Sequence, residues 1–324
     1  MTLLRQNEKV VLLIYVTLSI IMLGISLYLS TSVQNNNKTL LSNKIYVIHS
    51  GGDIEENFKE KHYNNRDKIG HFDINTYQPL INSSTISPSD WNYIANDIFD
   101  HYDNYDGFVI VCDKDTMTYT ASALAFMLEN LNKPIILTVN QLLETLILIS
   151  QTKIKEVMIL EQGKLLRGCR TILNSKEQFE SPKYPFLNLN NSLTPENKPM
   201  NVKHMNPNIN VLLIKVFPGM DSKYLLSLNT NNIHGIVFEI YSSGNIPLDK
   251  DILNVINTFA KKGIVMLADK KDIDIKLLEA GILSGGDMTP PAALAKLHFL
   301  LANVEDKKLI SRLLEQSFRG EITT

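Results

Sequence analysis

The sequence predicts an α/β fold in which short parallel strands alternate with helices. Apolar stretches of four to six residues, the length of a buried strand, recur along the chain. Between them lie longer segments whose apolar residues stand three and four positions apart, the spacing of a helix that buries one face. From Glu180 to Pro207 this alternation stops, and the stretch holds five prolines and many asparagines. The interruption predicts two α/β domains joined by a linker.

The larger domain is predicted over residues 44–185. It opens with an apolar strand at Lys44–Ile48. A helix follows, with Ser87 as its candidate N-cap and Pro88 at its first helical position. The next predicted elements are a strand at 107–112, a helix at 121–131 and a strand at 135–138.

Residues 186–209 are predicted to be the linker, and residues 210–324 a smaller α/β domain. Its predicted strands cover 211–216, 235–240 and 263–267, and its predicted helices cover 222–228, 249–260, 292–302 and 306–316.

Residues 1–43 are predicted to form a membrane anchor and tether. Residues 10–30 form a run of 21 residues without a charge. A helix of that length covers about 30 Å, the thickness of the hydrocarbon core. A cleaved signal peptide is the alternative, but its apolar core is shorter, and Leu27, Tyr28 and Leu29 stand where small residues would precede a cleavage site. A buried core helix is the third interpretation.

The charges beside this run predict its orientation. Arg5 and Lys9 precede it, and residues 31–37 after it carry no charge. The positive-inside rule then places the N-terminus in the cytoplasm and the bulk of the chain outside or in a lumen. Glycosylation sequons begin at Asn37, Asn82 and Asn190. They matter only in a eukaryotic secretory route, and an asparagine-rich chain also produces such matches by chance.

Charge and composition exclude several function classes. The chain has 32 basic and 34 acidic residues and a net charge of −2, so nucleic acid is not expected as a partner. Two cysteines, Cys112 and Cys169, cannot build a disulfide scaffold or a four-cysteine zinc site. The seven histidines show no metal-binding spacing, so neither a metal nor a cofactor is expected.

Three polar segments follow predicted strands closely: residues 50–53, 113–116 and 242–245. Ligand sites of open parallel sheets form where loops meet at the carboxyl ends of strands. These segments are therefore candidate site loops. The alternative is that they are tight turns without a further role.

Several longer stretches carry a resemblance to a known family. They are residues 77–91, 105–138, 163–171, 217–220, 277–289 and 319–323. Over residues 44–323 the chain resembles the bacterial type I L-asparaginases, of the two-domain asparaginase/glutaminase family. The resemblance implies the two-domain fold of that family. It also implies hydrolysis of L-asparagine to L-aspartate and ammonia, in which a threonine attacks the amide while a second threonine, an aspartate and a lysine move protons.

The chain departs from this pattern at three of the four catalytic positions. The family motif Thr-Gly-Gly-Thr-Ile-Gly reads Ser-Gly-Gly-Asp-Ile-Glu here, so Asp53 replaces the nucleophile. The motif His-Gly-Thr-Asp-Thr-Met reads Cys-Asp-Lys-Asp-Thr-Met, so Asp113 replaces a glycine and Lys114 replaces the second threonine, while Asp115 is retained. The lysine position holds Leu173.

These replacements predict impaired chemistry. Attack on an amide by a carboxylate gives a mixed anhydride, which is a poor route, and Leu173 cannot carry a proton. Because the two family threonines face each other across the substrate, Asp53 and Lys114 are expected within ion-pair reach of one another.

The resemblance also implies substrate-binding residues. Ser83, Ser84 and Asp115 match the family's binding residues, and Asn245 matches an asparagine that a partner subunit contributes. These residues predict binding of L-asparagine or L-aspartate in a homo-oligomer, or they serve only to hold loops. Three segments are shorter than in the family: the lid at 56–72, the connection at 139–155 and the segment at 268–276, which in the family helps to complete the neighbouring subunit's site.

Three hypotheses follow from the sequence. The first is a membrane-anchored, catalytically impaired protein that acts by binding or assembly. The second is an active amidohydrolase of altered substrate that uses Asp53 or Asp115. The third is a structural module that binds no small molecule.

Overall fold

The computed structural model describes residues 43–65, 68–182, 186–228, 230–247 and 249–323. The predicted anchor at residues 10–30 lies outside this part of the chain. Within the described ranges, no helix combines the length and the apolar character needed to span a bilayer.

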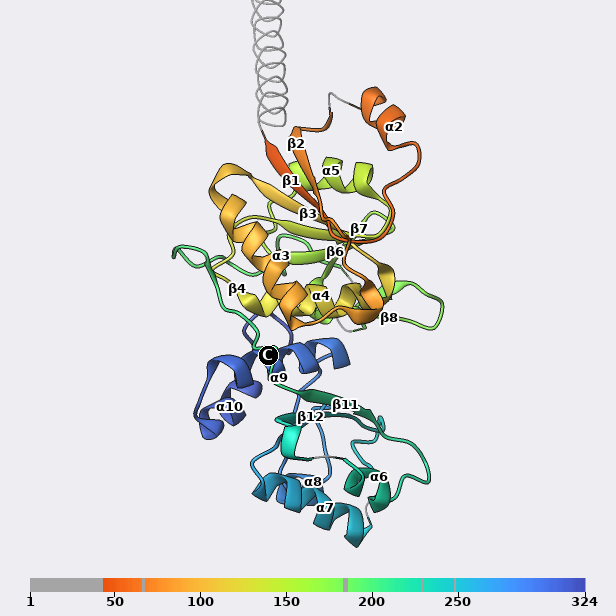
Figure 1. Cartoon of the computed structure of the whole chain (residues 1–324), viewed down its shortest axis with the longest axis vertical. Coiled ribbons are helices and arrows are strands. Elements are labelled where there is room, and N and C mark those ends of the chain that lie inside the picture. The colour runs from red at the N-terminus through yellow and green to blue at the C-terminus, as the bar shows by residue number, and fades with distance from the viewer. Residues whose placement is uncertain (1–42, 66–67, 183–185, 229, 248, 324) are drawn as a thin grey trace, which may run out of the picture.

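The first domain is built on a six-stranded sheet, seen edge-on in the upper half of Figure 1. Five neighbouring strands are parallel, and the last pairs antiparallel as a hairpin. In spatial order the strands are β2 (His71–Thr76), β1 (Lys44–His49), β3 (Gly107–Val111), β5 (Ile135–Thr138), β6 (Val157–Glu161) and β7 (Lys164–Arg167). The predicted parallel sheet is therefore confirmed.

Helices cover both faces of this sheet, because successive side chains of a strand point to opposite faces. In β1, Tyr46 and Ile48 pack into one apolar cluster with the helices α3 (Pro88–His101) and α4 (Lys114–Met127). Ile45 and Val47 pack into the other cluster. That second cluster contains α2 (Phe58–Asn64) and α5 (Leu142–Gln151).

The start of α3 agrees with the prediction, and the start of α4 does not. At α3, the carboxylate of Asp90 accepts hydrogen bonds from the Ser87 amide at 2.8 Å and the Ser87 hydroxyl at 2.7 Å, which forms the expected cap. The α4 helix begins at Lys114 rather than at residue 121. The first two turns of α4 are largely polar, so the apolar spacing of the sequence did not predict them as helix, although Met117 is buried there.

The second domain has a smaller sheet of four parallel strands, in the lower part of Figure 1. In spatial order these are β11 (Val211–Lys215), β12 (Gly235–Glu239), β13 (Val265–Ala268) and β14 (Ile282–Ser284). The helices α6 (Ser222–Leu226), α7 (Lys250–Lys261) and α8 (Ile275–Ala280) accompany it. This is the smaller α/β domain that the sequence predicts.

The two domains share one apolar core. Helix α9 (Pro290–Asn303) packs on α4 of the first domain and on the sheet of the second, and Figure 1 shows it between them. The rings of Phe126 and Phe299 lie 6.2 Å apart across this contact. Helix α10 (Lys307–Leu314) follows α9 and contributes Ile310 to the same cluster.

Part of the segment predicted as the linker pairs with the first domain. Strand β10 (Asn201–Val202) lies antiparallel to β4 (Leu128–Glu129). Before the linker, β8 (Ile172–Leu173) and β9 (Phe179–Glu180) form a hairpin. This hairpin stands beside the candidate site.

Candidate functional site

The loop after β1 is held tightly against the end of β3. The amides of Ser50 and Gly51 donate to the carbonyl oxygen of Val111 at 3.0 and 3.2 Å. Gly52 has a φ of +70°, and a Cβ there would stand 3.1 Å from the carbonyl oxygen of Cys112. Gly52 is therefore required by its backbone conformation, and Gly51 by close packing, since a Cβ there would stand 3.1 Å from the Ile81 carbonyl oxygen.

Two carboxylates stand at this loop. Asp53 is exposed, directly after the glycines. Asp113 is the N-cap residue of α4, but its side chain makes no capping hydrogen bond. Its Oδ2 lies 3.2 Å from the point where a Cβ on Gly51 would stand. Asp113 thus puts a carboxylate against the loop that carries Asp53, at a position where the resemblance implies a glycine.

The expected ion pair between Asp53 and Lys114 is not formed. Lys114, the first residue of α4, instead points its ammonium at Glu177 Oε2, at 3.5 Å. Glu177 belongs to the turn of the β8–β9 hairpin. Among the described residues, Lys114 has no other carboxylate within ion-pair distance. The prediction was wrong because no sequence pattern indicates that this hairpin reaches the start of α4.

A cavity of about 650 Å³ lies at the junction of the domains. Asp115 and Leu173 line it together, so two of the four positions expected to be catalytic face one space. Asp115 is exposed in the first turn of α4, and Leu173 is half-buried in β8. Asp53 and Lys114 are not among the lining residues. The further charged residues of the lining are Arg170, Glu239, Asp269, Lys270, Lys271 and Asp287.

Several of these charged groups are paired with one another or with their neighbours. Arg170 and Asp287 form a buried ion pair of 2.9 Å. Burial would raise the pKa of Asp287, but hydrogen bonds from Thr323 and Arg170 outweigh it and lower this pKa to about 2. Asp269 accepts a hydrogen bond from the Ile240 amide and pairs with Lys270 at 2.6 Å.

The predicted serines lie beside the β1 loop. The Ile81 amide donates to the Ser50 carbonyl oxygen at 2.7 Å, which brings this segment to the loop. Ser83 begins the short helix η2 (Ser83–Thr85). The hydroxyl of Ser84 donates to Asn82 Oδ1 at 2.8 Å, so it already serves a local turn.

Asn245 lies apart from these residues, in a loop of the second domain. Its carbonyl oxygen accepts a hydrogen bond from the Tyr241 amide at 3.1 Å, and its Oδ1 is buried without a hydrogen-bond partner. It does not line the interdomain cavity.

The sequence reasoning missed Glu177 and the cavity residues of the second domain. Glu239 ends β12 and Asp269 directly follows β13, and both lie within two residues of the ends of the predicted strands, so the rule that selected residues 50–53 could have found them. Glu177 carried no comparable signal. Within the described ranges, no group of three or more histidine, cysteine, aspartate or glutamate side chains is arranged to hold a metal ion.

Comparisons with known proteins agree with this architecture. Residues 44–198 match the family model "Asparaginase, N-terminal", and residues 210–314 match "Glutaminase/Asparaginase C-terminal domain". The chain is 32% identical to L-asparaginase 1 of Escherichia coli K12 over 330 residues, which cover 86% of this chain and 98% of that protein.

Solved structures show the same relationship. The crystal structure of L-asparaginase I from Vibrio cholerae superposes with a TM-score of 0.77 at 30% identity and covers 87% of this chain and 100% of its own. The L-asparaginase of Thermococcus kodakarensis gives a TM-score of 0.74 at 25% identity, over 87% of this chain and 99% of its own.

Proposed function

The chain belongs to the asparaginase/glutaminase family, and we propose that it is a membrane-anchored member, impaired in asparagine hydrolysis, that acts by binding or assembly. The observation that carries the proposal is the environment of the four catalytic positions. Asp53 is exposed, Lys114 is turned to Glu177, and Leu173 presents an apolar side chain to the cavity. Of the family's groups, only Asp115 is retained, and it faces the cavity.

The chemistry of these side chains argues against the ordinary reaction. The family mechanism needs a hydroxyl nucleophile held by groups that accept its proton. None of Asp53, Lys114 and Leu173 supplies a hydroxyl. Asp113 adds a carboxylate beside the loop that carries Asp53, and a carboxylate close to an attacked amide would oppose the negative charge that develops on its oxygen.

The retained residues support binding. A cavity of about 650 Å³ is in the range of small-molecule sites. Asp115 can accept hydrogen bonds from the α-amino group of L-asparagine or L-aspartate, the ligands that the family relationship suggests. A second copy of the chain would bring Asn245 to this site, as the family pattern implies.

Ammonia release from L-asparagine tests the impairment. The purified full-length chain is compared with the Escherichia coli relative under the same conditions. We expect a rate lower by a factor of about 10³ or more, the loss typical when a nucleophile and its proton carrier are both removed. Turnover close to that of the relative would overturn the proposal.

Thermal unfolding with added L-asparagine or L-aspartate tests the binding. A ligand at 100 times its dissociation constant should stabilise the chain by about 2.7 kcal/mol. Asp115→Ala should remove this stabilisation. No shift with either amino acid would favour the structural module, which binds no small molecule.

The second candidate is an active amidohydrolase with an altered substrate. The exposure of the Asp115 carboxylate to the cavity favours it. It requires a measurable hydrolysis of some amide, and Asp115→Ala must abolish that hydrolysis.

The membrane anchor and its orientation are part of the proposal and rest on residues 10–30. Fractionation of cells that express the full chain tests them. The full chain should stay with the membrane after alkaline washing, and a chain lacking residues 1–43 should not. Protease added to intact cells or sealed vesicles should reach the folded domains only from the non-cytoplasmic side.

A further inference from the structure

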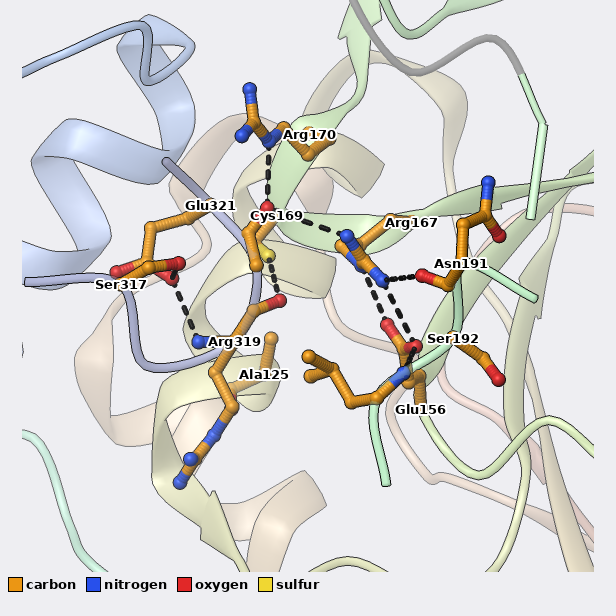
Figure 2. A network of polar contacts seen from close by, with 12 residues as sticks. Ala125, Glu156, Arg167, Cys169, Arg170, Asn191, Ser192, Ser317, Arg319 and Glu321 are labelled. Carbon is orange, nitrogen blue, oxygen red and sulfur yellow. Dashed lines mark hydrogen bonds and ion pairs between the residues drawn. The ribbon is translucent and has the colours of Figure 1, made fainter. Parts of the chain in front are cut away.

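The last described residues, Ser317–Thr323, cross the junction of the two domains, and we call them the strap. Figure 2 shows the strap against the segment that carries Arg167, Cys169 and Arg170. We propose that the strap is a detachable latch, which joins the domains behind the cavity and opens locally while both domains stay folded. The inference is independent of the proposed function.

On the side of the first domain, the strap accepts hydrogen bonds at two main-chain carbonyl oxygens and donates one from a side chain. Arg170 Nε donates to the Gly320 carbonyl oxygen at 2.7 Å, and the Cys169 thiol donates to the Arg319 carbonyl oxygen at 3.3 Å. In the opposite direction, Arg319 Nε donates to the carbonyl oxygen of Ala125, in α4, at 2.8 Å. Cys169 is buried in the main apolar cluster with only 1% of it exposed, and its thiol faces the strap at the Arg319 carbonyl oxygen.

On the side of the second domain, one buried ion pair anchors the strap. Glu321 lies 2.7 Å from the ammonium of Lys296 in α9, and neither side chain is exposed. Lys296 also donates to the Leu314 carbonyl oxygen at 3.0 Å. The Glu321 carboxylate accepts the amide of Arg319 at 2.7 Å, so the anchor also fixes the bend of the strap. A buried ion pair is stable only when the remaining donors and acceptors of both groups are also hydrogen-bonded, as they are here.

The strap is not a strand of either sheet and not part of a helix, and each of its contacts with other segments described above involves a side chain. Within the described part of the chain, no backbone–backbone hydrogen bond joins residues 317–323 to another segment. The strap can therefore leave without breaking a ladder of either domain. An opening confined to such a segment costs less free energy than global unfolding.

The strap also contacts the cavity wall. Arg170 and Asp287 line the cavity, and Thr323 binds both of them: its hydroxyl accepts from Arg170 Nη2 at 3.1 Å, and its amide donates to Asp287 Oδ1 at 2.8 Å. Arg170 precedes Leu173 by three residues. Release of the strap removes a partner from each of these wall residues and so alters the cavity.

Two glycines allow the strap to pass this closely. Gly286 has a φ of +65°, and a Cβ there would stand 2.8 Å from the Ile322 side chain. Gly320 has a φ of +73°, and a Cβ there would collide with the guanidinium of Arg167. Gly163 has a matching φ of +74° but no atom near its missing Cβ, so it provides a control for the backbone conformation alone.

The reactivity of Cys169 toward a thiol reagent tests the latch. The chain has only one other cysteine, Cys112, so Cys112→Ala leaves Cys169 as the single thiol. In that background, Gly320→Ala should raise the rate of labelling in native buffer by at least about tenfold, because it favours the open strap. Gly163→Ala should leave the rate within about twofold of the parent, because its strain lies far from the strap.

The reciprocal background separates local from global opening. With Cys169→Ala, the remaining thiol is Cys112, which is buried at the end of β3. Its labelling should not change with Gly320→Ala. If Cys112 is labelled faster by the same factor, or if Gly320→Ala leaves Cys169 unreactive, the latch is refuted. Should Gly320→Ala fail to fold, Thr323→Val replaces it and should act in the same direction.

Discussion

The ammonium of Lys114 lies 3.5 Å from Oε2 of Glu177, which joins the start of α4 to the turn of the β8–β9 hairpin. Glu177 is largely exposed, so the attraction itself contributes no more than about 1 kcal/mol. The turn is shaped by Asn174, whose Oδ1 accepts the amides of Lys176 and Gln178 at 2.9 and 3.0 Å. This turn, and not the strength of the ion pair, places Glu177 opposite Lys114.

The backbone of Glu177 predicts a stabilising substitution. Its φ of +56° is in the left-handed region, which costs a side-chain-bearing residue about 1–2 kcal/mol relative to glycine. Glu177→Gly should therefore raise the free energy of unfolding by about 1 kcal/mol, although it removes the partner of Lys114. Urea denaturation of the parent and of Glu177→Gly measures the difference in their free energies of unfolding.

Glu177→Gln is the matched control for this substitution. It keeps the strained backbone and removes only the charge, so its stability should stay within about 0.5 kcal/mol of the parent. A loss of stability in Glu177→Gly would mean that the ion pair matters more than the conformation of the turn.

Asp287 predicts a loss of stability in acid. Its pKa is about 2 in the folded chain, below the usual value of 3.8, so the unfolded chain takes up a proton first as the pH falls. The stability that this carboxylate contributes is complete above about pH 4 and is lost as the pH falls toward 2. At neutral pH, Asp287→Asn removes the negative charge opposite the buried Arg170 guanidinium and should cost about 3–5 kcal/mol.

The contribution of Asp287 is checked by measuring the denaturant midpoints of the parent and of Asp287→Asn from pH 7 to pH 2. The difference between the two should shrink as the pH drops below 4. Asp53→Asn serves as the control, because Asp53 is exposed and should shift stability by less than about 0.5 kcal/mol at any pH. A constant difference for Asp287→Asn across the range would contradict the assignment.

We predict that Lys296 and Glu321 are strongly coupled in their contributions to the free energy of unfolding. Burial lowers the pKa of Lys296, and the charge of Glu321 opposes that effect. Lys296→Met leaves the Glu321 carboxylate buried without an opposite charge and should destabilise the chain by about 3–5 kcal/mol. The double variant with Glu321→Gln should lose less than the sum of the two single variants. Lys308→Met, exposed on α10, should change stability by less than about 0.5 kcal/mol.

The sequence predicted best where local chemistry decides the structure. Strand β5 has the predicted bounds, Ile135–Thr138, because three successive apolar residues after a proline leave few alternatives. The start of α3 follows from Ser87 and its cap. Strand β2 was missed because it is an edge strand with polar, half-exposed residues such as Asp73, and its pairing with β1 decides its conformation.

The candidate site could be predicted only in part, since its contacts join distant segments. The resemblance identified Asp115 and Leu173, and the cavity brings these two together. It also led to the expectation that Lys114 would pair with Asp53. The pairing with Glu177 depends on the shape of a turn 63 residues away, which no periodicity indicates.

Restoring the family residues tests how much of the proposed impairment each position explains. The triple variant Asp53→Thr, Lys114→Thr and Leu173→Lys regains a nucleophile, a second hydroxyl and an ammonium. We expect little ammonia release from it, because Asp113 still places a carboxylate beside Gly51 and opposes negative charge on the attacked oxygen. Adding Asp113→Gly should raise the rate by at least about tenfold, since one such electrostatic contact is worth 10²–10³ in other enzymes. Equal rates for the triple and quadruple variants would show that Asp113 is irrelevant and that the shortened loops limit the reaction.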